Sequence, residues 1–353
     1  MTALMRNRMR EALRATNEPH AGLLLTRGWP TYVNGGDANE GADKSSHIDR
    51  VCRLKPSALY EMAFERWQTC TRDSQRFHGW YGRLEGRMFI GLGTGGALET
   101  GVLTSHSYGM PMIPGSSVKG VARAHALQLG VPPEYRAILF GEDEDEVAHS
   151  GRQAGAGSLV WHDAWWCPDA QCLPFAAEVV TVHHQSYYHG EGEATDFDSP
   201  VPNAQIAVQG SFYFVVEGAP TWAVRAMALL RHALSDTGMG AKRAAGYGGI
   251  KEHAQLVRKD CETRQALRRR EMGPEERVRD YLSGLDAKQL AEKFGPDLNK
   301  TLEQFSDEEK GLLPVVGQEL RAAMLEEWAT ETKKSNKARF KARRYFMGQG
   351  NDD

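Results

Sequence analysis

The sequence contains no run of about 18 consecutive apolar residues, which is the length that a membrane-spanning helix needs. Its first residues, MTALMRNRMREAL, are charged throughout, whereas a secretory signal has an uninterrupted apolar segment. Cysteine is scarce, and the five irregularly spaced thiols fit no disulfide framework. We therefore expect a cytoplasmic protein that has no part in a membrane.

An excess of charge of either sign is also missing. The chain has 43 Lys and Arg against 46 Asp and Glu, a formal net charge of -3. Nucleic-acid binding would therefore have to depend on local basic patches, because the chain as a whole offers no attractive field. With 353 residues, 41% of them hydrophobic, the protein is long enough for a sizeable core or for two average domains.

Motifs of nucleotide-binding and catalytic sites are incomplete. The glycines of residues 91–96 satisfy G-x-G-x-x-G, but no helix is predicted after them to receive a pyrophosphate. The run GSSVKG at 115–120 lacks the residue order of a phosphate-binding loop, and no serine lies in G-x-S-x-G. Cys167 and Cys172 have no second cysteine pair at zinc-ribbon spacing. We expect no catalytic residue, no metal and no other cofactor.

The central part of the chain has apolar residues at strand and helix periods. Strands are predicted over 83–92, 157–166 and 178–182, and a helix over 116–129 with Leu129 on its apolar face and Ser116 or Ser117 as its cap. Residues 206–216 predict one long alternating strand, 222–235 a helix, and a last strand should begin near Tyr247. This order is that of a ferredoxin-like α+β fold, the fold of the RNA recognition motif, with the third strand enlarged by a long hairpin insertion.

Helical patterns flank this centre. Residues 3–16 predict an amphipathic helix with a basic side, and Pro56 suits the first turn of another helix, in a region that we expect to be peripheral. Beyond residue 257 no strand is predicted, and helices are expected over 258–271, 274–282, 287–294 and 308–334. A basic tail, 333–344, either is solvated or binds nucleic acid. The predicted domains are 1–80, helical or irregular; 81–256, ferredoxin-like; and 257–353, a helical extension.

The segment GMGAKRAAGYGG, residues 238–249, combines glycine with two basic residues and a tyrosine. Glycines let backbone amides approach a ligand, the cations attract phosphate, and tyrosine can stack on a base. The alternative is a glycine-rich turn whose cations face water. The candidate RNA-binding residues here are Gly238, Gly240, Lys242, Arg243, Gly246, Tyr247 and Gly248.

A long excursion, residues 183–205, carries paired imidazoles and paired phenols. His183, His184, Tyr187 and Tyr188 could stack on unpaired bases, which predicts a hairpin that contacts RNA or a protein partner. An ordinary loop is the alternative. A metal site would draw on His183, His184, His189, Asp196 and Asp198. It is disfavoured because the two adjacent histidines of an extended chain point to opposite faces.

Residues 87–124 and 238–249 together resemble the RAMP superfamily of CRISPR proteins. The resemblance lies in the glycine-rich strand exit, in Glu99-Thr100-Gly101, in GMPMIPGSSVKG at 109–120 followed by Arg123, and in the later glycine-rich loop. The segment from HHQSYY at 183–188 to DSPVP at 198–202 is similar to the sixth RAMP subunits of type III-B (Cmr) effector complexes. The resemblance covers about residues 80–253.

This resemblance implies a non-catalytic subunit that holds guide (CRISPR) RNA near its 3′ end and caps a filament of sibling RAMP subunits in antiviral defence. It implies RNA contact by the glycine-rich loop and by the basic pair Lys119 and Arg123, and a thumb-like role for 183–202 at the guide:target RNA duplex. Cleavage of target RNA is implied to belong to a sibling subunit. The alternative is a stand-alone RAMP endoribonuclease that processes guide precursors with His106, His183 or His184 as general base.

Overall fold

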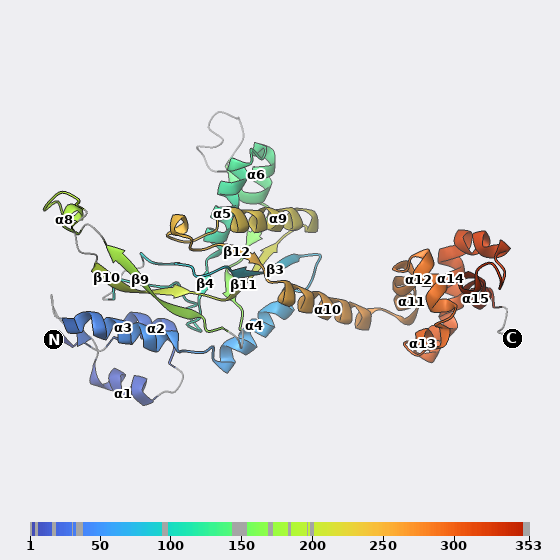
Figure 1. Cartoon of the computed structure of the whole chain (residues 1–353), viewed down its shortest axis with the longest axis horizontal. Coiled ribbons are helices and arrows are strands. Elements are labelled where there is room, and N and C mark those ends of the chain that lie inside the picture. Colours follow the sequence, from blue (N-terminus) through green and yellow to red (C-terminus); the bar gives the residue numbers. More distant parts are fainter. Residues whose placement is uncertain are drawn as a thin grey trace. The chain divides into compact units, whose positions relative to one another are not determined.

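The chain separates into two compact units in the computed structural model, Met1–Arg258 and Lys259–Asp353 (Figure 1). The structure describes residues 2–3, 6–15, 19–29, 31–32, 38–93, 98–142, 154–168, 172–182, 185–195, 197 and 201–348. Within these ranges, no helix combines the length and the apolar character needed to cross a membrane.

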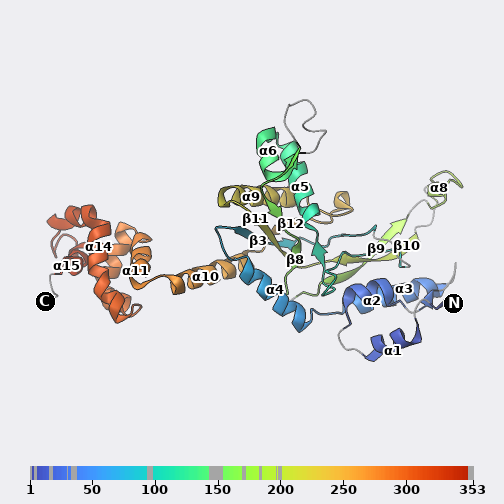
Figure 2. The ribbon, with the colours of Figure 1, turned by 180° about the vertical axis from the view of Figure 1, so that it is seen from behind.

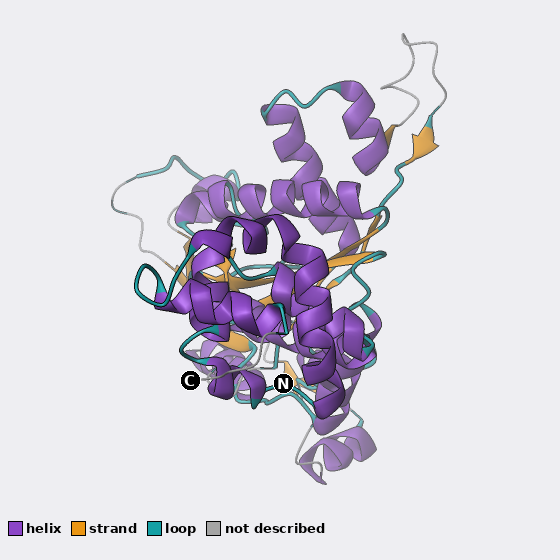
Figure 3. Ribbon diagram, turned by 90° about the vertical axis from the view of Figure 1, so that its right-hand side faces the viewer, coloured by secondary structure: helices purple, strands orange, loops and turns teal. Residues whose placement is uncertain are grey.

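The first unit is built on an antiparallel sheet of six strands. Their order is β12–β3–β11–β8–β4, and β7 pairs with β11 beside this path. The protein thus mixes helix and antiparallel sheet, as predicted, and Figure 3 shows that helix predominates. The strands are β3 (Phe77–Leu84), β4 (Met112–Ile113), β7 (Val160–Trp161), β8 (Ala164–Trp166), β11 (Ser211–Glu217) and β12 (Ile250–Glu252).

Strand β11 is buried on both faces. Phe212, Phe214 and Val216 point into the main core, to which α5 (Gly115–Gln128) and α9 (Pro220–Asp236) contribute. Figure 1 shows these two helices on the same side of the sheet. The alternate residues Tyr213 and Val215 lie in a second cluster with Phe64 of α4 (Ala58–Cys70). The sheet is therefore enclosed by helices on both sides.

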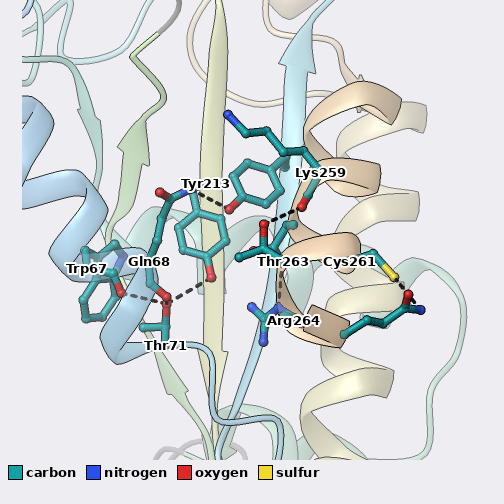
Figure 4. A network of polar contacts seen from close by, with 11 residues as sticks. Trp67, Gln68, Thr71, Tyr213, Lys259, Cys261, Thr263 and Arg264 are labelled. Atoms are coloured by element: carbon teal, nitrogen blue, oxygen red, sulfur yellow. Dashed lines mark hydrogen bonds and ion pairs between the residues drawn. The ribbon is translucent and has the colours of Figure 1, made fainter. Parts of the chain in front are cut away.

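Helix α4 covers the face that an RNA recognition motif leaves open. Tyr81 of β3 and Tyr213 of β11 stack there with ring centroids 4.6 Å apart, yet they are only 2% and 0% exposed. Thr71, at the end of α4, is hydrogen-bonded to the Tyr213 hydroxyl at 3.0 Å, and Gln68 donates to the Tyr81 hydroxyl at 2.8 Å (Figure 4). Tyr81 and Tyr213 are thus unavailable for stacking on bases.

The N-terminal region is not peripheral, contrary to the prediction. Leu24 of α2 (Ala21–Arg27) and Ile48 and Val51 of α3 (Ala38–Cys52) lie fully buried in the main core. The predicted basic amphipathic helix is present as α1 (Asn7–Ala15). Short strands β1 (Thr2–Ala3) and β2 (Thr31–Tyr32) pair with each other.

The prediction of one long strand over 206–216 is wrong, because the chain turns at Gly210. This glycine has a φ of +95°, and the preceding Gln209 carbonyl accepts a hydrogen bond from the Trp166 indole at 2.8 Å. Residues before the turn form β10 (Val201–Val208), which pairs along its whole length with β9 (Phe175–Val182). This hairpin extends away from the main sheet alongside α3, and α8 (Gln185–Tyr188) lies at its tip (Figure 2).

Other predicted boundaries also needed correction. The strand predicted over 83–92 is β3, which ends at Leu84, and beyond it the chain forms only isolated bridges at Met88 and Phe89. The strand predicted over 157–166 is broken into β7 and β8. The remaining elements of this unit are α6 (Pro133–Phe140), β5 (Gly141–Glu142) and β6 (Gly155–Ala156).

The start of α5 is capped from a distance and not by a serine. Neither Ser116 nor Ser117 caps the helix, because both lie inside it, after Gly115. Instead the Gly115 amide donates to Asp163 Oδ1 at 2.7 Å. At the other end, Leu129 is 56% exposed and does not join the apolar face, which ends at Ala126.

The second unit has its own apolar core, formed by helices alone. The helices predicted over 258–271, 274–282 and 287–294 are present, and the predicted long helix ends earlier, at Glu327. The predicted basic tail includes a helix, α15, whose Ala342 and Phe346 are fully buried in this core. The helices are α10 (Ala254–Glu271), whose first residues belong to the first unit, α11 (Pro274–Ser283), α12 (Ala287–Phe294), α13 (Leu298–Leu302), α14 (Asp307–Glu327) and α15 (Lys337–Phe346).

Removal of the Tyr60 hydroxyl tests the packing of α4. This side chain is 1% exposed, and its hydroxyl donates to the Trp166 carbonyl at 2.5 Å. Tyr60→Phe should destabilise the first unit by about 1 kcal/mol, because a buried hydrogen bond is lost. Hydrogen exchange of α4 and β8 amides measures this effect. Tyr135→Phe, at a 46% exposed ring, is the control and should change nothing; equal effects of both variants would contradict the assignment.

Glu309 should make the second unit sensitive to acid. The Ser306 amide, Arg277 and the Ser306 hydroxyl donate to its carboxylate, and together they outweigh burial and hold its pKa below the usual range. Because the pKa of Glu309 is lower in the folded state, its ionised carboxylate stabilises the fold at pH values above the unfolded-state pKa of about 4.3. This stabilisation is lost as the pH falls through the folded-state pKa.

Glu309→Gln should therefore increase hydrogen exchange in α11 and α14 at neutral pH, and it should weaken the dependence of that exchange on pH below about 4. The matched control is Glu308→Gln, because Glu308 is exposed on the same turn. The same acid sensitivity in wild type and Glu309→Gln would show that another group is responsible.

Candidate nucleic-acid interface

The glycine-rich segment 238–249 is an ordered loop that joins α9 to β12. Four of its five glycines, at positions 238, 240, 246 and 248, have positive φ, between +65° and +88°. Lys242 has a φ of +58°, which is uncommon for a residue with a side chain, and a single 3-10 turn, Arg243–Ala245, follows it. The glycines of this segment thus allow backbone torsions that most other residues avoid.

Backbone hydrogen bonds hold the base of the loop closed and join it to the segment that follows β3. The Ala241 amide donates to the Phe89 carbonyl, the Gly248 amide to the Arg87 carbonyl, and the Met239 amide to the Gly248 carbonyl, each at 2.9 Å. A Cβ at Gly248 would lie 1.8 Å from the Met239 carbonyl oxygen. Only glycine allows the two sides of the loop to approach this closely.

The tip of the loop is open to solvent. All five residues from Lys242 to Gly246 are exposed, and both cations lie among them. A Cβ at Gly246 would meet no heavy atom within 4 Å. A rigid backbone thus presents two positive charges on a surface with small neighbouring side chains, and a phosphodiester chain could approach it closely.

Tyr247 lies at the base of the loop, half-buried. Its ring is 4.7 Å from that of Phe89, and its hydroxyl donates to Glu178 Oε2 at 2.6 Å. Glu178, on β9, also pairs with Arg87, whose guanidinium donates to the Ala177 carbonyl. This network, which the sequence did not reveal, ties the loop to the hairpin. In this network the hydroxyl of Tyr247, the residue that we expected to stack on a base, is hydrogen-bonded within the protein.

The other predicted site residues come from separate elements. Lys119 and Arg123 are half-buried on α5, outside the loop. Tyr187 and Tyr188 lie in α8 at the hairpin tip, 55% and 74% exposed, with their rings edge-to-face. His183 and His184 lie outside the described residues.

A metal site can be examined only in part. Asp196 and Asp198 also lie outside the described residues, as do the two histidines. Among the residues that the structure does describe, no three His, Cys, Asp or Glu side chains are grouped as metal ligands would be. The metal set that the sequence disfavours therefore stays untested.

The model of the RAMP superfamily matches residues 83–251, a range that contains both the sheet and the glycine-rich loop. These residues are thus similar to the RAMP superfamily. More particularly, the chain is similar to the CRISPR system Cmr subunit Cmr6 of Pyrococcus furiosus. The two are 26% identical over 273 residues, which cover 61% of this chain and 79% of that protein. The resemblance seen in the sequence is thus confirmed.

Two solved structures are also similar. A type III-B Cmr-beta complex bound to cognate target RNA contains a chain that is 17% identical, with a TM-score of 0.46, over 63% of this chain and 78% of that one. The crystal structure of Cmr6 from Pyrococcus furiosus is 21% identical, with a TM-score of 0.31, over 50% of this chain and 98% of that one.

Alanine at two of the loop glycines should have unequal effects. Gly246→Ala meets open space and carries only the strain of a positive φ, about 1–2 kcal/mol. Gly248→Ala adds a collision with the Met239 carbonyl, so the loop must open. Hydrogen exchange of the Met239, Ala241 and Gly248 amides should rise strongly in Gly248→Ala and little in Gly246→Ala. Equal effects of the two substitutions would be inconsistent with the close approach at Gly248.

Proposed function

We propose that this protein is a non-catalytic, RNA-binding subunit of a type III-B CRISPR (Cmr) RNA-guided effector complex. In this proposal it holds the guide RNA near its 3′ end and caps the filament of sibling RAMP subunits. The similarity to Cmr6, which extends over 79% of that protein, supports this assignment. The further partners would be the target RNA and the neighbouring RAMP subunits.

The arrangement of the sheet supports a ferredoxin-like domain with an inserted hairpin. Strands β3, β8, β11 and β12, taken as first to fourth, lie in the order fourth–first–third–second. Helix α5 follows the first of these strands and α9 the third, and the two helices contact each other. The β9–β10 hairpin lies between the second and third strands in the sequence, where an inserted thumb is expected.

The glycine-rich loop is the observation that carries the proposal. Its base is hydrogen-bonded to the chain around Arg87–Phe89, and its tip presents Lys242 and Arg243 to solvent. Contacts to phosphate position an RNA strand without reading its sequence, which suits a subunit that must accept any guide. Lys119 and Arg123 would add phosphate contacts, and the exposed Tyr187 and Tyr188 would meet bases at the duplex.

Binding to RNA should depend on the two loop cations. Full-length Lys242→Ala/Arg243→Ala should bind single-stranded RNA several-fold more weakly than wild type in a gel-shift titration. The slope of the logarithm of the binding constant against the logarithm of the salt concentration should become shallower by about 1–2. The control is Arg53→Ala/Lys55→Ala, which removes two exposed cations of the N-terminal region.

The same titration, with and without divalent metal, tests the absence of catalysis. RNA that stays whole at every concentration supports the non-catalytic subunit. Metal-dependent shortening by the wild type would instead favour a stand-alone RAMP endoribonuclease. Equally strong binding by the double variant and the wild type would show that the glycine-rich loop is not part of the RNA-binding interface.

A further inference from the structure

An aromatic cleft lies on the first unit, outside the glycine-rich loop. It has a volume of about 440 Å³, within the range of small-ligand pockets. One wall is the outer side of α4, and the other is Trp165 of β8 with Tyr108 from the loop that precedes β4. The lining residues are Leu59, Met62, Ala63, Arg66, Trp67, Cys70, Tyr108 and Trp165.

Helix α4 has two apolar sides, and only one is needed for the fold. Tyr60 and Phe64 face the sheet and are buried. Leu59 and Met62 line the cleft and are each 60% exposed. Exposed apolar side chains that adjoin a pocket mark binding surfaces more often than isolated ones do. This side of the helix therefore has no evident structural purpose in the isolated chain.

The aromatic rings of the cleft are held in place from behind. The Trp165 ring stacks on Tyr60 with centroids 5.9 Å apart, lies 6.1 Å from Trp67 and is 5.8 Å from Tyr108. Tyr60 is itself fixed by its hydrogen bond to the Trp166 carbonyl. A ligand that stacks here would therefore meet an ordered surface and would not have to immobilise flexible rings.

We propose that this cleft binds an unpaired nucleobase of RNA, with Arg66 contacting the adjoining phosphate. Three aromatic rings offer stacking surfaces, a single guanidinium supplies the positive charge, and none of the eight lining residues carries a carboxylate. A peptide or a second protein could bind to the apolar residues of the cleft, but such binding would not require the positive charge of Arg66. The inference rests on the proposed function, since it presumes that the protein binds RNA.

Photocrosslinking of the full-length chain tests the site. The probe is a single-stranded RNA of about 12 nucleotides with one 4-thiouridine, a length near the upper range of a single-domain site. After irradiation, peptide mapping should find cross-links in residues 58–70 or at Tyr108 or Trp165. Met62→Glu, which places a carboxylate at an exposed position of the cleft, and Arg66→Ala should each reduce these cross-links about fivefold or more.

Two controls separate this inference from the proposed function. Arg53→Ala removes an exposed cation that does not line the cleft and should leave the cleft cross-links unchanged. Lys242→Ala/Arg243→Ala should weaken overall binding while the bound fraction still cross-links in the cleft. Normal RNA binding with cross-links confined to the loop or the hairpin would contradict nucleobase binding in the cleft but would still support the proposed function. Failure of the wild type to bind RNA would overturn both.

Discussion

The first unit depends on the burial of both faces of β11. Phe212 and Phe214 on one face and Tyr213 on the other are all at most 1% exposed, and each large side chain contributes about 1.5–3 kcal/mol when removed from water. Both faces of this strand are buried because α5 and α9 cover one face and α4 covers the other. The position of every candidate surface follows from that enclosure.

Enclosure of the sheet moves any RNA contact to its periphery. The tyrosines on β3 and β11 stack on each other under α4, so they cannot serve as a platform for bases. What stays exposed is the glycine-rich loop, the hairpin tip and the outer side of α4. A rigid frame positions loops and protruding hairpins without covering them, which is compatible with the proposed contacts to an RNA backbone.

Local patterns predicted some parts of the protein well and others poorly. Helices α10, α11, α12 and α14 were predicted because apolar residues recur there at helical spacing, whereas α13 and α15 were not predicted. The break at Gly210 was missed because the apolar alternation continues through it, and two strands of different sheets carry the same pattern. The cap of α5 was misassigned because its acceptor, Asp163, lies 48 residues away along the chain.

The amino-acid sequence by itself determined the glycine-rich loop and its cations, since close backbone approach, as at Gly248, requires glycine wherever the loop lies. It also determined the helical character of the second unit and the resemblance to RAMP proteins. Only the tertiary structure decided that Tyr247 anchors the loop to Glu178, that α4 closes the sheet, and that Trp165 and Tyr108 form a cleft with it. These features join residues far apart in the chain, and no local periodicity records which distant surfaces will meet.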